Sequence, residues 1–237
     1  MLTWDDLPAH FPEFPAPERW LPLLQAHARI LGENVASVRT TTVEAAEAVF
    51  RHYAESLELL RLVEGRHPPG PRVDIGPGGG FPGLVFAALQ PDVPITLIEP
   101  LKKRARLLEL AIEAMALPRA SVVALRAEEA GRTALREQAS LVVARAVAPL
   151  PELLEYCAPL ACPGALIALP KGRGLDQEVA AATTALTTLT CVVEDVVPMR
   201  PAVSATPHVL FIRKQGRVPA AYPRRPGVPR KRPLGSN

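Results

Sequence analysis

The sequence has few cysteines, few aromatic residues and no long apolar run. Its three cysteines, Cys157, Cys162 and Cys191, include no C-x-x-C pair and have no histidine nearby, which argues against a disulfide framework and against a zinc site. No apolar stretch approaches the roughly 18 to 20 residues of a membrane-spanning helix, and the first residues, with Asp5 and Asp6, lack the pattern of a signal peptide. We therefore expect a cytoplasmic protein with buried thiols and no metal.

Aromatic residues make up only 5% of the chain, whereas hydrophobic residues make up 48%. This balance predicts a core of leucine, valine and alanine and argues against a disordered chain. The length of 237 residues suits one α/β domain with an appendage, because roughly 150 residues per domain is a loose prior.

Acidic residues are absent after Ile212, although the same segment carries eight basic residues. The net charge of +3 therefore conceals an acidic main part and a basic end. Such a separation concentrates positive potential at one end of the molecule, as expected for a protein with a polyanionic partner. The basic residues are Arg213, Lys214, Arg217, Arg224, Arg225, Arg230, Lys231 and Arg232.

Residues 1–67 have the pattern of a helical extension. Four prolines between residues 8 and 17 predict a stiff, extended start, and a first helix begins near Glu18. A second helix follows the three threonines at 40–42, which supply N-cap candidates. Its apolar residues form one stripe that needs a surface to pack on. They are Val43, Ala46, Phe50, Tyr53, Leu57 and Leu60.

A proline-rich break at 67–71 ends this extension, because proline removes a hydrogen-bond donor and disfavours helix in the residue before it. Short apolar runs and helical stretches then alternate, which predicts parallel strands joined by right-handed crossovers. We expect an α/β fold with a doubly wound, mostly parallel, seven-stranded Rossmann-like sheet at 68–215 and a basic surface tail at 216–237. The predicted strands lie near 72–75, 95–99, 121–125, 140–146, 165–169, 191–197 and 208–213, and the predicted helices near 82–89, 101–116, 127–138, 150–160 and 175–189.

A glycine-rich loop follows the first predicted strand, with Gly76, Gly78 and Gly80 leading through Phe81 into an apolar helix. Glycine lets the backbone turn sharply and approach a ligand closely, and the helix start offers unpaired N–H groups. Such a loop alone fits an S-adenosylmethionine-dependent methyltransferase, a dinucleotide enzyme or a structural turn. The G-x-G-x-G spacing differs from the dinucleotide G-x-G-x-x-G pattern, and Asp74 lies within the strand, so we favour the methyltransferase.

Two carboxylates follow the next strands and are candidates for binding the nucleoside of the cofactor. Glu99 ends the second predicted strand, where it can accept hydrogen bonds from both ribose hydroxyls or can be a solvated strand end. Glu128 follows the third, where adenine rests in this architecture. It or the neighbouring backbone could accept from the adenine amino group, although the helix dipole also favours a carboxylate there.

Three basic side chains complete the candidates. Arg145 follows the fourth predicted strand, at the edge where open α/β sheets bind ligands, and an anionic group explains it better than core packing. Lys171 reaches the same edge from the fifth strand, where it touches RNA phosphate or the cofactor region or is merely exposed. We interpret His52 as a structural or surface histidine, since the sequence pairs it with no nucleophile or metal ligand.

With these motifs the chain closely resembles the bacterial small-subunit (16S) ribosomal RNA guanine-N7 methyltransferases, the glucose-inhibited division protein B family. The resemblance covers about residues 20–235. Its last motif is the most specific, because general methyltransferases share the glycine loop but lack a proline- and arginine-rich ending. The motifs are Val-Asp-Ile-Gly-Pro-Gly-Gly-Gly-Phe-Pro-Gly (73–83), Leu-Ile-Glu-Pro-Leu-Lys-Lys-Arg (97–104), Arg-Ala-Glu (126–128), Ala-Arg-Ala (144–146), Leu-Pro-Lys-Gly (169–172) and Tyr-Pro-Arg-Arg-Pro-Gly-Val-Pro (222–229).

The resemblance implies methyl transfer from S-adenosylmethionine to N7 of a small-subunit guanine in the decoding region. At matching positions, Gly76 and Phe81 would contact the cofactor. Ala127 and Glu128 would bracket its adenine, and Arg145 would lie by the methionine end and the target base. The family often has Asp where this chain has Glu, at position 99, which preserves the carboxylate but leaves the ribose contact open.

We expect no catalytic base, because guanine N7 carries a lone pair and no proton at neutral pH. Catalysis would come from positioning, which can supply roughly 7 to 11 kcal/mol. The tail would grip RNA phosphates, with a solubilising tail as the alternative. The competing functions are a methyltransferase for another RNA or a small molecule, a nicotinamide-dependent oxidoreductase, and a non-catalytic RNA-binding protein. The residues predicted to grip RNA are Lys171, Arg224, Arg225, Arg230, Lys231 and Arg232.

Overall fold

The computed structural model describes residues 2–34, 38 and 47–236. A seven-stranded sheet with the order β3-β2-β1-β4-β5-β7-β6 forms its centre. Strands β1 to β5 are parallel, whereas β7 runs antiparallel to β5 and β6, which confirms the predicted doubly wound, mostly parallel sheet. The strands are β1 (Arg72–Ile75), β2 (Ile95–Ile98), β3 (Ala120–Val123), β4 (Ala139–Ala144), β5 (Ala161–Lys171), β6 (Cys191–Pro198) and β7 (His208–Lys214).

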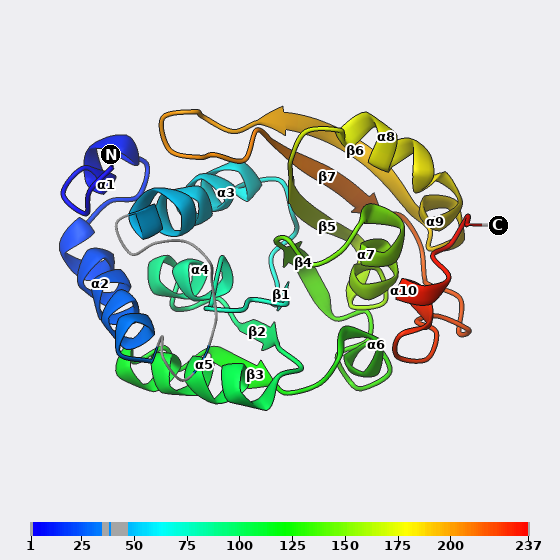
Figure 1. The fold of residues 1–237 in the computed structure, drawn as a ribbon, viewed down its shortest axis with the longest axis horizontal. Helices are drawn as coiled ribbons and strands as arrows, with labels where there is room; N and C mark the ends of the chain where they lie inside the picture. The colour runs from blue at the N-terminus through cyan, green and yellow to red at the C-terminus, as the bar shows by residue number, and fades with distance from the viewer. Residues whose placement is uncertain (1, 35–37, 39–46, 237) are drawn as a thin grey trace.

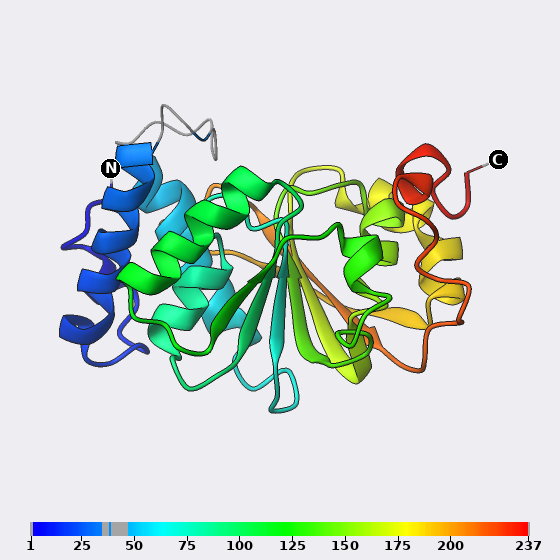
Figure 2. The same cartoon turned by 90° about the horizontal axis from the view of Figure 1, so that it is seen from below.

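Helices cover both faces of this sheet (Figures 1 and 2). One face carries α1 (Leu7–His10), α2 (Pro17–Asn34), the π-helical segment η2 (Val49–Ala54), α3 (Glu55–Val63), α4 (Gly83–Leu89) and α5 (Lys102–Ala114). The other face carries α6 (Ala127–Ala130), α7 (Leu150–Cys157), α8 (Leu175–Ala181), α9 (Thr183–Thr188) and, in the tail, α10 (Val228–Lys231). The N-terminal helices are therefore one layer of the molecule.

The sheet separates two hydrophobic cores because successive strand residues point to opposite faces. On β4, Leu141 and Val143 pack in the core with the N-terminal helices, whereas Val142 and Ala144 pack in the core with α7. Burial on both faces explains why β4 and β5 are largely apolar, whereas β1 buries the charged residues Arg72 and Asp74.

The predicted apolar stripe of the extension is buried where the structure describes it, except that Phe50 is only partly buried. Tyr53, Leu57 and Leu60 are at most 1% exposed, and they lie in the same core as Trp20 and Leu24 of α2. The predicted caps at 40–42 and the stripe residues Val43 and Ala46 fall outside the described residues.

Two predictions for this extension were wrong in detail. The proline-rich start is not extended throughout, because the short helix α1 places Pro8 in its first turn, where the missing N–H has no helical partner to lose. The second helix is π-helical over Val49–Ala54, a rare form that often occurs at functional sites and that changes which side chains share a face.

Two predictions in the sheet domain also differ from the structure. The helix predicted at 127–138 ends with α6 at Ala130, where Thr133 donates to the Ala130 carbonyl and the chain turns away. The helix predicted at 175–189 is divided at Ala182, and the Thr183 hydroxyl bonds to the Ala180 carbonyl there. Hydroxyl side chains near helix carbonyls compete with the helical backbone bonds in this way.

Candidate functional site

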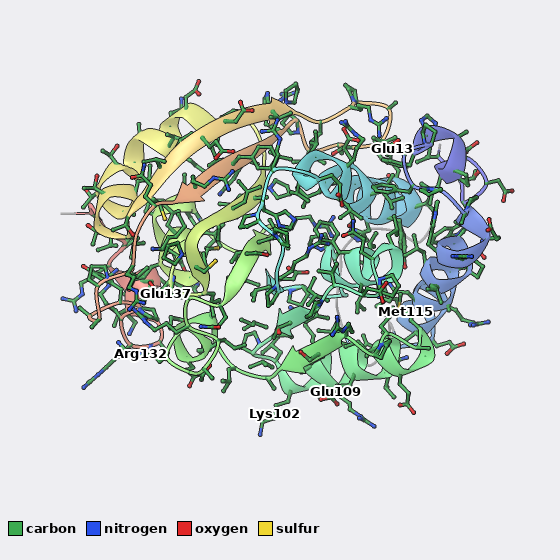
Figure 3. All side chains as sticks on the ribbon, turned by 180° about the vertical axis from the view of Figure 1, so that it is seen from behind. Glu13, Lys102, Glu109, Met115, Arg132 and Glu137 are labelled. Carbon is green, nitrogen blue, oxygen red and sulfur yellow. The ribbon has the colours of Figure 1, made fainter. Side chains whose placement is uncertain are left out.

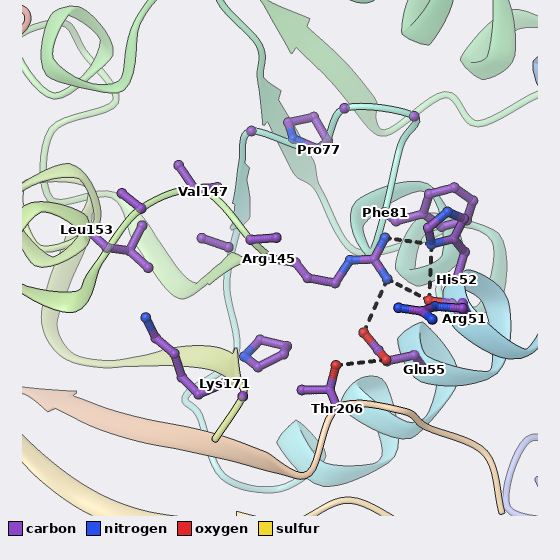
Figure 4. A pocket seen from close by; sticks show the side chains of 18 of the residues that line it. Arg51, His52, Glu55, Pro77, Phe81, Arg145, Val147, Leu153, Lys171 and Thr206 are labelled. Carbon is purple, nitrogen blue, oxygen red and sulfur yellow. Dashed lines mark hydrogen bonds and ion pairs between the residues drawn. The ribbon is translucent and has the colours of Figure 1, made fainter. Parts of the chain in front are cut away.

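A cavity of about 1020 Å³ opens at the carboxyl ends of β1, β4 and β5. It lies at the switch point between β1 and β4, where the chain turns from one half of the sheet to the other and where open α/β sheets bind ligands. Figure 4 shows side chains from the N-terminal extension, the sheet and the β6–β7 hairpin around it. The predicted site residues in its wall are Gly76, Gly78, Phe81, Arg145 and Lys171.

The glycine loop forms one wall of the cavity in a conformation that requires glycine. Gly76 and Gly80 have φ values of 64° and 103°, and L side chains rarely adopt such values. A Cβ atom would lie 2.9 Å from Val147 at Gly76 and 2.5 Å from Leu84 at Gly80. Between them, the N–H groups of Gly78 and Gly79 have no hydrogen-bond partner among the described residues. The loop therefore offers two backbone donors at the cavity.

Asp74 lies at the end of β1 beneath this loop and is fully buried. Its Oδ2 atom accepts a hydrogen bond of 2.7 Å from the Gly83 N–H at the start of α4, whereas Oδ1 has no partner. Burial raises the pKa of this carboxyl to about 8. The carboxyl thus joins β1 to α4 and holds the loop between them.

Phe81 forms the centre of an aromatic group behind the cavity. The His52 ring stacks on it with centroids 4.7 Å apart, and Tyr53 meets it edge to face at 4.9 Å. The guanidinium of Arg145 lies 5.5 Å from the same ring, a cation–π contact. Phe81, which the sequence predicts as a cofactor contact, therefore also connects the loop to the N-terminal extension.

The guanidinium of Arg145 is held at the cavity by the π-helical segment and α3. It donates to the Arg51 carbonyl at 3.0 Å, to Glu55 Oε1 at 3.3 Å and to His52 Nδ1 at 3.0 Å (Figure 4). Glu55 is itself buried, and its Oε2 accepts from the Thr206 hydroxyl of the β6–β7 hairpin at 2.9 Å. Arg145 is therefore held by the N-terminal extension, and the β6–β7 hairpin holds Glu55 in turn.

His52 lines the cavity and is buried, which excludes the interpretation as a surface histidine. Nδ1 of His52 lies 3.0 Å from both the Arg145 guanidinium, which can only donate, and the Arg51 carbonyl, which can only accept. Burial and the charge of Arg145 lower the pKa of His52 to about 4, so the ring is neutral at pH 7. The sequence could not reveal this pair, since 93 residues separate its members.

Lys171 ends β5 with its ammonium in the cavity wall. It is buried and forms an ion pair of 2.6 Å with Glu178 of α8. The same carboxylate accepts from the Leu150 N–H at the start of α7. The alternative of a merely exposed lysine is therefore wrong, and contact with the cofactor region or RNA stays a prediction.

Glu99, Ala127 and Glu128, predicted to hold the nucleoside, follow β2 and β3 and are outside the wall of the cavity. Glu99 is 2% exposed, and its Oε1 accepts from the Leu101 N–H. Glu128 is 3% exposed, and its Oε1 accepts from the Gly227 N–H of the tail at 2.9 Å. Their cofactor contacts stay predictions, and Glu128 also has a structural role that the sequence did not reveal.

Charged side chains fasten the tail to the domain. Arg136 donates to the carbonyls of Tyr222 and Val218, and Glu137 accepts from the Val218 N–H. Arg132 donates to the Pro223 carbonyl, and Figure 3 shows Arg132 and Glu137 beside the tail. The surface tail predicted from the sequence is therefore packed against α6 and α7.

Arg224 differs from the other cations of the tail. Its guanidinium forms a multiple hydrogen bond with Glu155, which is fully buried in α7, and this pairing raises the pKa of Arg224. Removing one partner of such a pair would leave a buried charge uncompensated. Arg224 therefore fastens the tail to the domain, and its contact with RNA phosphate stays a prediction. The tail cations that remain exposed are Arg217, Arg225, Arg230, Lys231 and Arg232.

The described residues contain no group of three or more His, Cys, Asp or Glu side chains placed to hold a metal ion. None of the helices in that part of the chain has both the length and the apolar character needed to cross a bilayer.

Sequence comparison with known proteins finds related proteins over most of the chain. The GidB model, described as rRNA small subunit methyltransferase G, matches residues 22–204. The ribosomal RNA small subunit methyltransferase G of Desulfitobacterium hafniense is 36% identical over 197 residues, which cover 82% of this chain and 81% of that protein. The protein of the same name from Symbiobacterium thermophilum is 40% identical over 202 residues and covers 82% of both chains.

Solved structures share the fold at low identity. Cofactor-bound Rv0187 from MTB has a TM-score of 0.56 at 16% identity and covers 92% of this chain and 100% of its own. A mutant of MtNAS in complex with S-adenosylmethionine also has a TM-score of 0.56, at 14% identity, and covers 90% of this chain and 84% of its own. These similarities agree with the Rossmann-like architecture.

Proposed function

The chain belongs to the rRNA small subunit methyltransferase G family, and on this premise we propose that it transfers a methyl group from S-adenosylmethionine to N7 of a guanine in small-subunit ribosomal RNA. The observation that carries the proposal is the cavity at the β1–β4 switch point, which joins a glycine loop to a fixed arginine. From the resemblance in sequence we expect the target guanine in the decoding region.

Two features of the glycine loop suit S-adenosylmethionine, namely its unpaired N–H groups and the close approach that Gly76 allows. The unpaired N–H groups of Gly78 and Gly79 are suited to a carboxylate, and no side chain could replace the hydrogen atoms of Gly76 without a clash. Glu99 would hold the ribose from the end of β2, and Ala127 and Glu128 would lie at the adenine. When bound, the cofactor supplies an electrophilic methyl group on a sulfonium.

The residues of this chain position the guanine and the cofactor for the reaction, and none is needed to remove a proton. Guanine N7 presents a lone pair, so the base must only be held in line with the methyl group. Arg145 suits this task because Arg51, His52 and Glu55 fix its guanidinium at the cavity. His52 is neutral and its Nδ1 atom lies 3.0 Å from the Arg145 guanidinium, which supports a role in orienting that residue.

Ribosomal RNA is the partner that the charge distribution favours. The exposed cations of the tail stand on a segment that Glu155, Glu128 and Arg136 fasten to the domain. In Figure 2 the tail helix α10 and the start of α5 lie on the same side of the molecule, which is the side of the strand carboxyl ends. Phosphate contacts from these places would orient the RNA over the cavity.

A transfer assay with labelled S-adenosylmethionine tests this proposal. We expect label in small-subunit particles from cells that lack the protein and none in large-subunit particles. Glu99→Gln should raise the cofactor concentration needed for half-maximal rate about tenfold, since a neutral amide binds ribose hydroxyls less strongly than a carboxylate.

The assay also separates the alternatives. Label found only in free nucleosides or in another RNA would replace ribosomal RNA as the substrate while keeping the methyltransferase. Naked ribosomal RNA and assembled particles, assayed side by side, would identify the form of the substrate.

A further inference from the structure

A buried histidine of the N-terminal extension contacts the backbone of the glycine loop. His27 of α2 is fully buried, and its Nε2 atom lies 2.7 Å from the carbonyl oxygen of Gly79, 52 residues further along the chain. Gly79 belongs to the cavity wall, whereas His27 lies behind the loop. A residue outside the sheet domain therefore contacts the backbone of the glycine loop.

The direction of each hydrogen bond follows from the chemistry of the groups. The Gly79 carbonyl can only accept, so Nε2 of His27 carries the proton and donates it. Nδ1 then accepts from the Tyr53 hydroxyl at 3.2 Å. Burial lowers the pKa of His27 to about 4 and raises that of Tyr53, so both groups keep these protonation states at pH 7.

The His27 ring also packs against the loop on this side. The His27 ring lies 5.1 Å from Phe81 and 5.8 Å from Tyr53, measured between centroids. A Cβ atom added to Gly80 would come within 3.1 Å of His27 Nε2. The histidine therefore contacts the loop both through a hydrogen bond and through its surface.

A core residue that served packing alone would not need these polar atoms. Burying an imidazole costs free energy that its hydrogen bonds only offset, and phenylalanine would fill a similar volume without that cost. The two hydrogen bonds of His27 instead define one position for one backbone carbonyl, next to the unpaired N–H groups of Gly78 and Gly79.

We propose that His27, oriented by the Tyr53 hydroxyl, is a positioning residue that holds the Gly79 carbonyl and thereby sets the loop for S-adenosylmethionine. The N-terminal extension is then part of the cofactor site and more than a support for the sheet. This inference rests on the proposed function, because it assigns the loop to that cofactor.

Calorimetric titration of S-adenosylmethionine into purified full-length variants tests the inference. His27→Phe keeps a ring and removes the donor, so we expect about fivefold to tenfold weaker cofactor binding, the effect of losing one hydrogen bond. His27→Gln keeps an N–H donor at a similar reach and should bind close to wild type. Tyr53→Phe should weaken binding to a smaller degree, since only the orienting hydroxyl is lost.

The controls separate positioning from folding. His27→Phe leaves the buried Tyr53 hydroxyl without a partner, so its unfolding temperature should fall, and adding Tyr53→Phe should raise it again. The kcat of His27→Phe at saturating cofactor should change less than its KM. His67→Phe, at the opposite end of β1, should leave cofactor affinity unchanged.

Wild-type affinity for the cofactor in both His27→Phe and Tyr53→Phe would overturn the inference. An equal loss of affinity in His27→Phe and His27→Gln would also do so, because the donor would then not matter. If the wild-type chain itself bound no S-adenosylmethionine, the proposed function would fail before this inference was tested.

Discussion

Asp74 shows how a single side chain can carry both structural and ligand chemistry. One of its oxygens bonds the Gly83 N–H, and the other is buried without a partner. A buried acceptor without a donor is costly unless the carboxyl is protonated or a ligand supplies the donor. Asp74 is therefore the residue whose protonation most directly reports on the loop.

We predict that the free energy of unfolding of the cofactor-free protein falls as pH rises through 8. Burial raises the folded-state pKa of Asp74 to about 8 from an ordinary value of 3.8. The folded state therefore holds an extra proton between these values. The stabilisation from this proton is complete below pH 4 and disappears as pH rises through 8. Between pH 7 and pH 9 the loss should be about 1 kcal/mol.

Urea unfolding of Asp74→Asn measures this contribution, because the amide cannot ionise. The difference in stability between wild type and Asp74→Asn should shift in favour of the variant from pH 7 to pH 9. A difference that stays constant over this range would show that Asp74 does not titrate as the structure implies.

Sequence analysis could find the site residues that lie in short motifs but could not find those joined only by the fold. Gly76, Gly78 and Phe81 follow one strand directly, and Arg145 follows the strand beside it in the sheet, so strand ends predict their meeting at the cavity. His27, Tyr53 and Glu55 come from helices with no ligand-binding pattern. Their partners are 26 to 151 residues away along the chain.

At the scale of secondary structure, the tail is the element with the clearest double role. Glu155 and Glu128 hold it by Arg224 and by the Gly227 N–H, and these contacts leave its other cations exposed. An exposed cation on a fixed segment loses less freedom on binding a phosphate than one on a mobile segment. Sequence composition predicted the charge of this segment but not the carboxylates that fasten it.

We predict that replacing Arg225, Arg230, Lys231 and Arg232 by alanine weakens binding of small-subunit RNA and reduces its salt dependence. Each phosphate contact contributes about 0.7 to 0.9 to the slope of log affinity against log salt, so the slope should fall in magnitude by about 3. Filter binding over a range of salt concentrations measures both quantities.

Arg119→Ala is the matched control, because this exposed arginine precedes β3 at the amino ends of the strands. It should leave the slope unchanged. A wild-type slope in the fourfold variant would show that the tail cations do not contact phosphate. The affinity of both variants for the cofactor should stay at its wild-type value.

The helix boundaries show where local patterns were insufficient. Residues 131–138 have no strong helix breaker apart from Gly131, yet they form the turn that holds the tail through Arg136 and Glu137. A Cβ atom on Gly131 would lie 3.1 Å from both Pro159 and Pro223. These tertiary contacts end the helix, and the sequence does not display them.

At the scale of the whole molecule, the cavity is built from three parts of the chain. The sheet supplies the glycine loop and Arg145, the N-terminal extension supplies His52 and Glu55, and the β6–β7 hairpin supplies Thr206. The division at 67/68 and 215/216 stays a prediction, although one hydrophobic core contains residues from both the extension and the sheet. Alternation of strands and helices was enough to predict the sheet, whereas the packing of the extension on the loop required the fold.

Mapping the methylated position shows whether this protein methylates N7 of a small-subunit guanine. Small-subunit particles from cells lacking the protein would be treated with the purified chain and S-adenosylmethionine, and the RNA would then be cleaved chemically at N7-methylguanosine. We predict one new cleavage, which depends on both the chain and the cofactor and lies at a guanine of the decoding region. Methyl incorporation without any new cleavage, or cleavage of another RNA alone, would contradict it.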